Sequence, residues 1–447
     1  MTAIKPSRAA MLAIGRLEAQ GHEAYAVGGC VRDSLLGRAP NDWDLTTSAL
    51  PDQTLACFED CRTIEIGKQH GTIAVILEGE TLEITTYRVD GDYADNRHPL
   101  SVTYSESLCD DLSRRDFTIN AMAYHPERGI VDPFGGREDL SHRLIRAVGN
   151  PKKRFEEDGL RILRAIRFAS VLGFTLERET DREVHACRHL LRNIAQERIR
   201  EEFCKLIMGR DAVRILRTYR DVIAVFLPEL TPTFDFLQNS KYHCYDVWEH
   251  TLHALEATSS DRLTVRLAIL LHDVGKPHCY TEDADGGHFK GHAEHSISLS
   301  EQLLRRLRFD SATVEQIRKL VRYHDVPIIP EKKYVKRAIL RFGDEGLSDF
   351  LEVFRCDRLA HHPDHCELPP FLAEVPLLAE QIRAEDACLS LKSLAVHGED
   401  LLGIGYRPGR ELGEALNALL SAVIDEELPN EREALLLYAE QTLKKQH

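Results

Sequence analysis

The chain has 447 residues, 43% hydrophobic and 29% charged, so it is long enough for several folded domains and too apolar for a disordered protein. Its formal net charge of −15 is not the basic excess typical of nucleic-acid-binding proteins, so such binding requires a local basic surface. No run reaches the roughly 18–20 apolar residues that span a membrane, and the N-terminal segment lacks the apolar stretch of a signal peptide. We therefore expect a cytoplasmic protein whose 11 scattered cysteines are reduced thiols.

Short β-rich runs alternate with helical segments up to about Val148. Tyr25-Ala26-Val27 is predicted to be a strand that runs into Gly28-Gly29, and residues 42–45 are predicted to be a second strand. Further strands are predicted at residues 63–67, 71–77 and 81–87. From Pro151 onward, apolar residues recur at intervals of three and four, which is typical of amphipathic helices.

This order of elements predicts an α+β protein, with an α/β head at residues 1–148 followed by an elongated all-helical body. We divide the body into a neck at 149–235, a histidine-rich domain at 236–370 and a tail at 371–447, with breaks near residues 230–245 and 365–385. The neck and the tail are expected to bind RNA.

The head contains a glycine turn followed by a pair of acids. Gly28 and Gly29 lie between the first strand and a predicted helix, where backbone N–H groups can approach a phosphate and Arg32 can add a forked contact. Asp42 and Asp44 lie two residues apart on the predicted second strand, so both carboxylates point to one face. Paired carboxylates are the ligands that Mg²⁺ needs in phosphoryl transfer, and Glu83 is a candidate third carboxylate.

Taken singly, these features also fit solvated loops, and only their combination in one strand–turn–helix–strand context favours catalysis. Cys30 has no histidine partner nearby in the sequence, and we interpret it as a packing residue. Farther along, Asp158, Arg161 and Arg164 are predicted to follow one another on a helix, at a spacing that is also typical of a salt-bridged solvent face.

Five ordered segments of this chain resemble the motifs of the DNA polymerase β-like nucleotidyltransferases, specifically the bacterial tRNA nucleotidyltransferase and poly(A) polymerase family with its class II CCA-adding members. These segments are GGCVRD at 28–33 with Asp42 and Asp44, RRDFTINA at 114–121, DPFGG at 132–136, EDGLRILR at 157–164 and QERIREEF at 196–203. They extend over about 180 residues.

The resemblance implies a polymerase β-like head that adds and repairs the 3′-terminal CCA of tRNA from CTP and ATP, without a nucleic-acid template. It implies that Asp42 and Asp44 hold Mg²⁺, and that Asp158 and Arg161 serve as the template for the incoming base. It assigns the nucleotide, largely its phosphates, to a further set of residues: Gly28, Gly29, Arg32, Arg115, Arg164 and Arg167. The partners implied are the tRNA 3′ end and acceptor arm. The segment RVDGDYADNRHPLSVTYSE resembles the family's flexible loop.

Other members of the family remain alternatives. A poly(A) polymerase usually has an arginine-rich segment after the third strand, where this chain has IGKQHGTI at 66–73, which favours the tRNA enzyme. Enzymes that add only CC or only A share the same motifs, so partial addition stays open. The oligomeric state is not indicated by the sequence.

The second half of the chain contains histidines and aspartates in the order H…HD…H…H…D, which resembles the HD phosphohydrolase superfamily, an all-helical bundle. The resemblance implies His250, His272, Asp273 and Asp357 as ligands of a divalent ion, which could be Ni²⁺, Mn²⁺, Fe²⁺, Zn²⁺ or Mg²⁺. His292, His295 and His324 are second-rank candidates. The reaction implied is attack of water on a phosphomonoester or a 2′,3′-cyclic phosphate at a damaged RNA end. The alternatives are a vestigial domain, or one that acts only in an oligomer.

Overall fold

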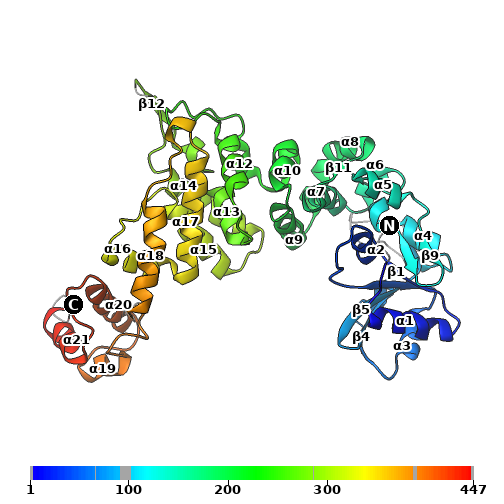
Figure 1. The fold of residues 1–447 in the computed structure, drawn as a ribbon, viewed down its shortest axis with the longest axis horizontal. Coiled ribbons are helices and arrows are strands. Elements are labelled where there is room, and N and C mark those ends of the chain that lie inside the picture. Colours follow the sequence, from blue (N-terminus) through cyan, green and yellow to red (C-terminus); the bar gives the residue numbers. More distant parts are fainter. Residues whose placement is uncertain (1–3, 66, 91–101, 285, 386–389, 444–447) are drawn as a thin grey trace. The chain divides into compact units, whose positions relative to one another are not determined.

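The computed structural model describes residues 4–65, 67–90, 102–284, 286–385 and 390–443 (Figure 1). Two compact units divide the chain, one at residues 1–228 and one at residues 229–447. The finer division of the body into neck, histidine-rich domain and tail stays a prediction. The central part of the expected flexible loop, residues 91–101, lies outside the described residues. Among the helices that are described, none is long and apolar enough to span a membrane.

The first unit is built around a seven-stranded mixed sheet. In spatial order the strands are β3 (Arg62–Ile64), β4 (Thr72–Leu77), β5 (Glu80–Thr86), β2 (Asp44–Thr47), β1 (Ala24–Val27), β8 (Ala123–His125) and β9 (Gly129–Val131). Strands β2 and β5 run parallel, whereas the other neighbouring pairs are antiparallel. The alternating burial of β4 reflects its one apolar face, while β1 is buried along its whole length. The α+β head is therefore confirmed.

Short helices flank this sheet. They are α1 (Arg8–Ala19), α2 (Gly29–Leu35), α3 (Pro51–Cys57), α4 (Leu108–Ser113) and α5 (Gly136–His142), and a two-stranded ribbon joins β6 (Arg88–Asp90) to β7 (Val102–Tyr104). The side chain of Ser7 caps α1 by accepting from the N–H of Ala10, at 3.1 Å. The apolar face of α1 packs on β1, β2 and β5, which gives the sheet a core on that side.

The rest of the first unit is helical. It contains α6 (Pro151–Glu157), α7 (Leu160–Leu172), α8 (Arg178–Cys187), α9 (Gln196–Ile207), α10 (Ala212–Thr218) and α11 (Arg220–Phe226), with a small parallel pair, β10 (Leu144–Ile145) and β11 (Thr175–Leu176). The three-and-four spacing of apolar residues predicts α7 and α9, and the structure confirms both. These two helices pack against each other, so the neck carries its own core.

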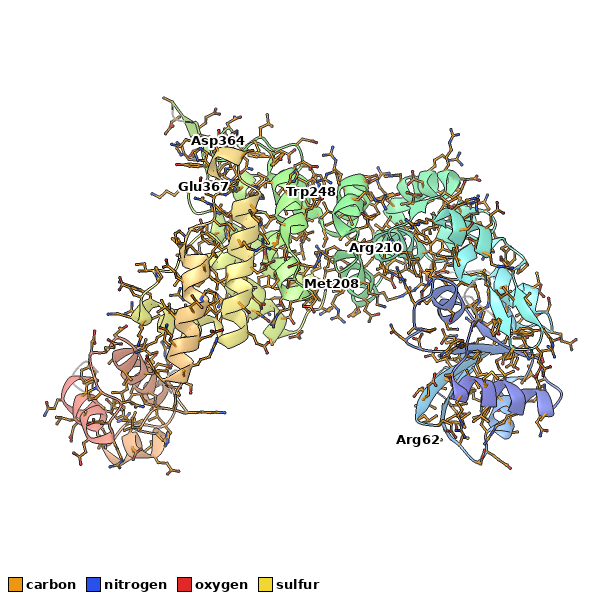
Figure 2. The ribbon with its side chains drawn as sticks, viewed as in Figure 1. Arg62, Met208, Arg210, Trp248, Asp364 and Glu367 are labelled. Carbon is orange, nitrogen blue, oxygen red and sulfur yellow. The ribbon has the colours of Figure 1, made fainter. Side chains whose placement is uncertain are left out.

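The second unit is a helical bundle with a separate C-terminal cluster. Its elements are α12 (Val247–Ala257), α13 (Leu263–Leu271), β12 (Thr281–Asp283), β13 (Gly286–His288), α14 (His292–Arg306), α15 (Ser311–Tyr323), α16 (Lys332–Phe342), α17 (Asp344–Leu359), α18 (Phe371–Ala384), α19 (Gly398–Gly403), α20 (Arg410–Ile424) and α21 (Arg432–Tyr438). Helix α13 packs against α12, α15 and α17. The indole of Trp248, labelled in Figure 2, is 1% exposed and belongs to this core.

The backbone after α13 comes unusually close to α14. The N–H of Gly275 donates to the hydroxyl of Ser296 at 2.9 Å. A Cβ on Gly275 would lie 2.7 Å from Cβ of His295, and closer still to the backbone atoms of Ser296 and His292. Because backbone atoms cannot yield as a flexible side chain does, the close approach of these two segments requires a residue without a side chain here.

We predict that Gly275→Ala destabilises the second unit by about 1–3 kcal/mol, because the added methyl group must push α14 away from the segment after α13. Gly413→Ala is the matched control, since a Cβ there meets nothing within 4 Å inside α20. The control is expected to stabilise by up to about 1 kcal/mol. Chemical denaturation followed by circular dichroism checks both values, and an unchanged stability of Gly275→Ala would contradict the packing described.

Candidate functional site

The glycine turn of the head lies where β1 ends and α2 begins. Gly28 has φ +81°, a left-handed conformation that favours glycine, and its N–H donates to the carbonyl of Met122 at 3.2 Å. A Cβ on Gly28 would lie 3.1 Å from Nη1 of Arg115. The turn therefore lies beside an arginine that the sequence assigns to the nucleotide, while the N–H of Gly28 itself is engaged by Met122.

Three carboxylates lie near one another at the edge of the sheet next to this turn. Asp44 begins β2 and lies opposite Glu83 in the parallel pairing of β2 with β5. Asp42 precedes the strand, so the prediction that both aspartates lie on one strand is wrong by two residues; the chain enters β2 only at Asp44. Burial first, and then the charges of Asp42 and Glu83, raise the pKa of Asp44 to about 6, so both acids lie within electrostatic reach of Asp44. The three acids are not among the groups of described residues whose ligand atoms lie within 4.8 Å of one another.

Cys30 lies beneath this edge with its thiol directed at the carbonyl oxygen of Val27, at 3.3 Å. Burial, and then the charge of Asp44, raise the pKa of the Cys30 thiol to about 12. The thiolate form is therefore negligible at neutral pH, which agrees with the interpretation of Cys30 as a packing residue.

Arginines gather around the ring of Phe168 on α7, a residue that the sequence did not single out. The guanidinium carbons of Arg32, Arg164 and Arg167 lie 5.1, 5.5 and 3.5 Å from the ring centre. Because a guanidinium stacks favourably on an aromatic face, Phe168 holds three like charges together.

Each of these arginines is already paired with an acceptor. Arg32 donates to Asp33 at 2.9 Å and to the amide oxygen of Asn120 at 2.6 Å. Arg164 binds Asp116 at 2.6 Å, and Arg167 binds Glu202 at 2.8 Å. Arg115 binds Asp111 at 3.1 Å. The sequence-predicted phosphate ligands are thus brought together, but with counterions that the sequence did not identify.

Among the acids that pair with these arginines, Asp116 has the most strongly shifted pKa. Burial opposes its ionisation, but the charge of Arg164 and hydrogen bonds from Asn120 and Arg164 hold the pKa of this carboxyl well below its usual value. Asp116 is therefore charged at neutral pH and fixes the side chain of Arg164 in one position.

Asp158 and Arg161 are arranged differently from the prediction. The predicted continuous helix is wrong, because α6 ends at Glu157 and α7 begins at Leu160. Asp158 is extended between them, with φ −141°. A Cβ on Gly159 would lie 3.1 Å from Cβ of Leu190, so a larger residue here would require that segment to shift slightly.

The two residues also have different partners from each other. Asp158 accepts from Arg198 of α9 at 2.8 Å. Arg161, 9% exposed, donates to Glu157 at 2.6 Å and to the carbonyl of Arg114 at 3.0 Å. Arg198 is a functional candidate that the sequence analysis missed, although it belongs to the QERIREEF segment.

The histidine–aspartate cluster forms in the second unit. His250 lies on α12, His272 and Asp273 follow α13, and Asp357 lies on α17; their ligand atoms all fall within 4.8 Å of one another. Nε2 of His250 lies 2.9 Å from Asp357, and Nε2 of His272 lies 3.2 Å from Asp273. The four predicted ligands are thus brought together from three parts of the chain.

The orientation of both imidazoles suits a cation. Nδ1 of His250 lies 3.1 Å from the carbonyl oxygen of Ala360, and Nδ1 of His272 lies 2.6 Å from that of Ile269. A carbonyl only accepts, so each Nδ1 carries hydrogen and each Nε2 faces the carboxylates. Among the described residues, Nε2 of His272 and both oxygens of Asp273 are buried without a hydrogen bond of normal geometry, although Oδ2 of Asp273 forms an ion pair with Lys276. The orphaned Nε2 of His272 and Oδ1 of Asp273 fit a divalent ion.

A second group of histidines shares Asp273. Oδ1 of Asp273 lies 3.5 Å from Nε2 of His292 and 3.8 Å from Nε2 of His324, while its Oδ2 faces His272. Nδ1 of His292 and of His324 again lie beside carbonyl oxygens, at 3.0 and 2.7 Å. His295 is exposed and belongs to none of the ligand groups found among the described residues.

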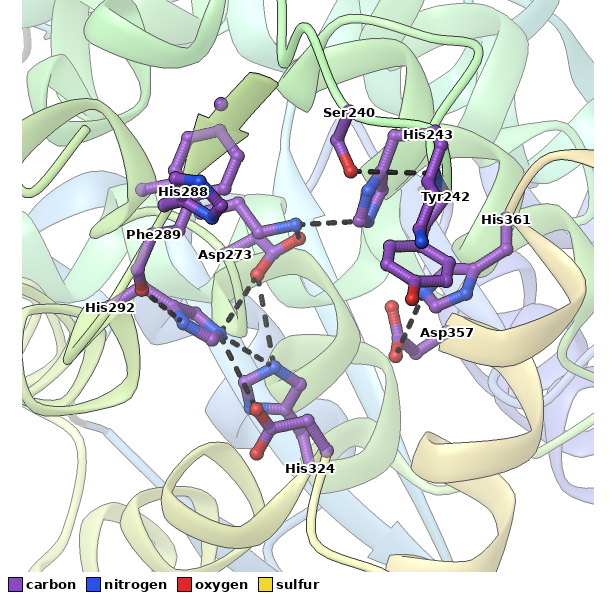
Figure 3. Close-up of a pocket in the computed structure, with 14 residues that line it drawn as sticks. Ser240, Tyr242, His243, Asp273, His288, Phe289, His292, His324, Asp357 and His361 are labelled. Carbon is purple, nitrogen blue, oxygen red and sulfur yellow. Dashed lines mark hydrogen bonds and ion pairs between the residues drawn. The ribbon is translucent and has the colours of Figure 1, made fainter. Parts of the chain in front are cut away.

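A cavity of about 750 Å³ opens over these groups (Figure 3). The cavity is lined by four of the predicted ligand candidates: Asp273, His292, His324 and Asp357. It is also lined by polar residues that the sequence analysis did not identify, namely Lys276, His243 and His361. The ammonium of Lys276 is 5% exposed and lies 2.6 Å from Asp273. The cavity is large enough for a phosphate ester and is lined by groups that bind anions as well as cations.

Known proteins resemble this chain along almost its whole length. Family profiles match residues 24–146 (poly A polymerase head domain), 173–234 (probable RNA- and SrmB-binding site of polymerase A) and 292–439 (tRNA nucleotidyltransferase domain 2, putative). The chain is 34% identical over 434 residues to the CCA-adding enzyme of Geobacillus thermodenitrificans and 33% identical over 435 residues to that of Lactobacillus helveticus. Each alignment covers 96% of both proteins.

Among solved structures, the Bacillus stearothermophilus CCA-adding enzyme in complex with CTP matches 98% of this chain and 98% of its own. The TM-score is 0.70 and the sequence identity is 30%. The fold is thus similar along almost the whole chain.

We predict that Asp44→Asn stabilises the metal-free first unit at pH 8. The pKa of Asp44 is about 6 in the folded protein, whereas the ordinary value for an aspartate is 3.8. The folded state therefore binds the carboxyl proton more tightly than the unfolded state, and folding becomes less favourable once Asp44 ionises. Asparagine removes that penalty, which is worth up to about 3 kcal/mol above pH 6 and vanishes near pH 4.

Thermal unfolding in a chelating buffer from pH 4 to pH 8 measures this difference. Asp52→Asn is the control, because the side chain of Asp52 is 85% exposed and its removal is expected to have almost no effect. If Asp44→Asn proved less stable than the wild type at pH 8, the crowding of carboxylates described here would be refuted.

Proposed function

This chain belongs to the family of CCA-adding enzymes, which are tRNA nucleotidyltransferases, and from that premise we propose that Asp42 and Asp44 form its catalytic centre. The enzyme adds the 3′-terminal CCA of tRNA from CTP and ATP. The observation that supports the assignment of the centre is the placement of Asp44 opposite Glu83 and within electrostatic reach of Asp42, beside the Gly28 turn.

In the reaction, the 3′-hydroxyl oxygen of tRNA attacks the α-phosphorus of the nucleotide and loses its proton. The bond from that phosphorus to the β-phosphate oxygen breaks, and pyrophosphate leaves. Asp42 and Asp44 would hold Mg²⁺, which supplies charge neutralisation for the attacking and leaving oxygens. The role of the protein chain is to bind the triphosphate at the Gly28 turn and at Arg32, Arg115, Arg164 and Arg167.

Base selection is assigned to Asp158 and Arg161. A carboxylate accepts and a guanidinium donates, which matches the amino group and the neighbouring ring nitrogen of both cytosine and adenine. Uracil and guanine present the reverse pattern and leave polar groups unpaired. Asp158 is paired with Arg198, and Arg161 is paired with Glu157, so these two pairs would open when a base binds.

We predict that Asp42→Ala combined with Asp44→Ala lowers nucleotide addition by about three orders of magnitude or more, because the Mg²⁺ ligands are lost. The assay offers CTP and ATP, singly and together, to tRNA transcripts that end before CCA, after C and after CC. The matched control, Asp52→Ala with Asp60→Ala, removes two exposed acids from the same unit and is expected to keep full activity.

The same assay separates the alternatives within the family. Wild-type protein that stops at CC, or extends only the CC end, would be a partial enzyme. Extension of unrelated RNA with ATP alone would instead identify a poly(A) polymerase. Full activity of the Asp42/Asp44 double variant would overturn the proposed centre. We also propose the cytoplasm, where tRNA matures, as the compartment of this enzyme.

A second function is proposed for the helical bundle: a metal-dependent phosphohydrolase of the HD type. Oδ1 of Asp273 and Nε2 of His272 favour it, because buried polar atoms are rarely left without partners unless a ligand completes them. His250, His272, Asp273 and Asp357 would hold the ion, which would supply a bound water of lowered pKa for attack on phosphorus. Attack on a phosphomonoester would release the alcohol and phosphate, whereas attack on a 2′,3′-cyclic phosphate would open the ring to a phosphomonoester. The two hydrolyses in succession would restore an RNA 3′-hydroxyl for nucleotide addition.

We predict that the full chain binds Ni²⁺ or Mn²⁺ at this cluster and that His272→Ala weakens the binding at least about tenfold. Isothermal titration with each metal measures affinity, and hydrolysis of a 2′,3′-cyclic nucleotide in the presence of each metal and of Mg²⁺ measures turnover. His295→Ala is the control, since this exposed histidine lies outside the ligand groups. Equal metal affinity of His272→Ala and wild type would refute this site.

A further inference from the structure

Lys276 fixes the tautomer of a neighbouring histidine. Its ammonium lies 2.6 Å from Asp273, 2.8 Å from the amide oxygen of Gln238 and 3.2 Å from Nε2 of His243. An ammonium group has only donors, so Lys276 donates in its hydrogen bonds to Gln238 and His243. Nε2 of His243 must therefore accept, and the hydrogen of the neutral ring is carried by Nδ1.

That N–H group has no acceptor. Among the described residues, Nδ1 of His243 is buried and makes no hydrogen bond. The ring lies against His250 and His361, with centroids 5.0 and 4.7 Å away, and His243 lines the cavity above the histidine–aspartate cluster (Figure 3). A buried donor without an acceptor costs free energy, so its retention in a cavity indicates a ligand that accepts.

A further metal ion is the alternative ligand of His243, because the ligand atoms of His243, His250 and His361 lie within 4.8 Å of one another. The nitrogens of His250 argue against it. Nδ1 donates to the carbonyl of Ala360 at 3.1 Å, and Nε2 faces Asp357 at 2.9 Å, so His250 has no nitrogen left for another ion once it holds the first.

We propose that His243 binds a non-ester oxygen of the substrate's phosphate group, donating from Nδ1 as a neutral imidazole oriented by Lys276. The inference rests on the phosphohydrolase function proposed above and deepens it, because it identifies the substrates as phosphate esters held between His243 and the metal ligands Asp273 and Asp357. A neutral donor suits this place, since it binds an anionic oxygen without repelling the nearby divalent ion.

The test measures binding of inorganic phosphate to the full chain loaded with Mn²⁺, by isothermal titration, for wild type, His243→Phe and His243→Gln. His243→Phe keeps an aromatic ring at this position but removes the N–H donor. Phosphate affinity is therefore expected to fall about tenfold or more, while Mn²⁺ affinity stays within about twofold. His243→Gln restores an N–H donor and is expected to recover part of the affinity. For p-nitrophenyl phosphate, the KM of His243→Phe is expected to rise more than kcat falls.

His288→Phe is the matched control: His288 also lines the cavity, but it is exposed and its ring binds Asp283 at 2.9 Å. Its phosphate affinity is expected to stay within about twofold of wild type. Unchanged phosphate affinity in His243→Phe overturns the inference, and so does loss of Mn²⁺ affinity in both His243 variants, which would make His243 a metal ligand. If wild-type protein binds Mn²⁺ but no phosphate, only the role of His243 is overturned. If it binds no divalent metal, the proposed phosphohydrolase function is overturned as well.

Discussion

Negative charge gathered at two places is the constraint on which the rest of this structure depends. In the head, Asp44 lies within electrostatic reach of Asp42 and Glu83, and its partial burial makes its ionisation unfavourable. In the bundle, burial opposes the ionisation of Asp273, but His272 and Lys276 hold the pKa of this carboxyl well below its usual value. The surrounding fold must be rigid enough to hold these acids in place, and a divalent cation would offset the cost of crowding them in the head.

The arginines of the head show the complementary arrangement. Arg32, Arg164 and Arg167 gather at Phe168, but each is paired with an acid or an amide of the protein. An incoming triphosphate would therefore exchange one set of anionic partners for another, which limits the net gain in affinity and keeps the cationic side chains ordered before the nucleotide arrives. Preorganisation of this kind favours selectivity over tight ground-state binding.

The break between α6 and α7 has a similar consequence for base selection. Because the helix stops at Glu157, Asp158 leaves the helical face and pairs with Arg198 of α9, while Arg161 stays on α7. The two side chains are thus anchored by different helices. A shift of α9 relative to α7 would change the direction of Asp158 without moving Arg161, so the pair is sensitive to the packing of the neck.

The sequence by itself determined the α+β head, the helical body and the residues that gather at each centre, because those follow from local periodicity and from short motifs such as GGCVRD and EDGLRILR. It also identified the four histidine and aspartate residues of the bundle by their order along the chain. Tertiary structure alone decided where β2 begins and that Gly159 separates two helices, since both depend on neighbours distant in sequence. It also brought Phe168, Arg198, Lys276 and His243 to the sites, because contacts between segments tens of residues apart leave no local pattern from which such partners can be predicted.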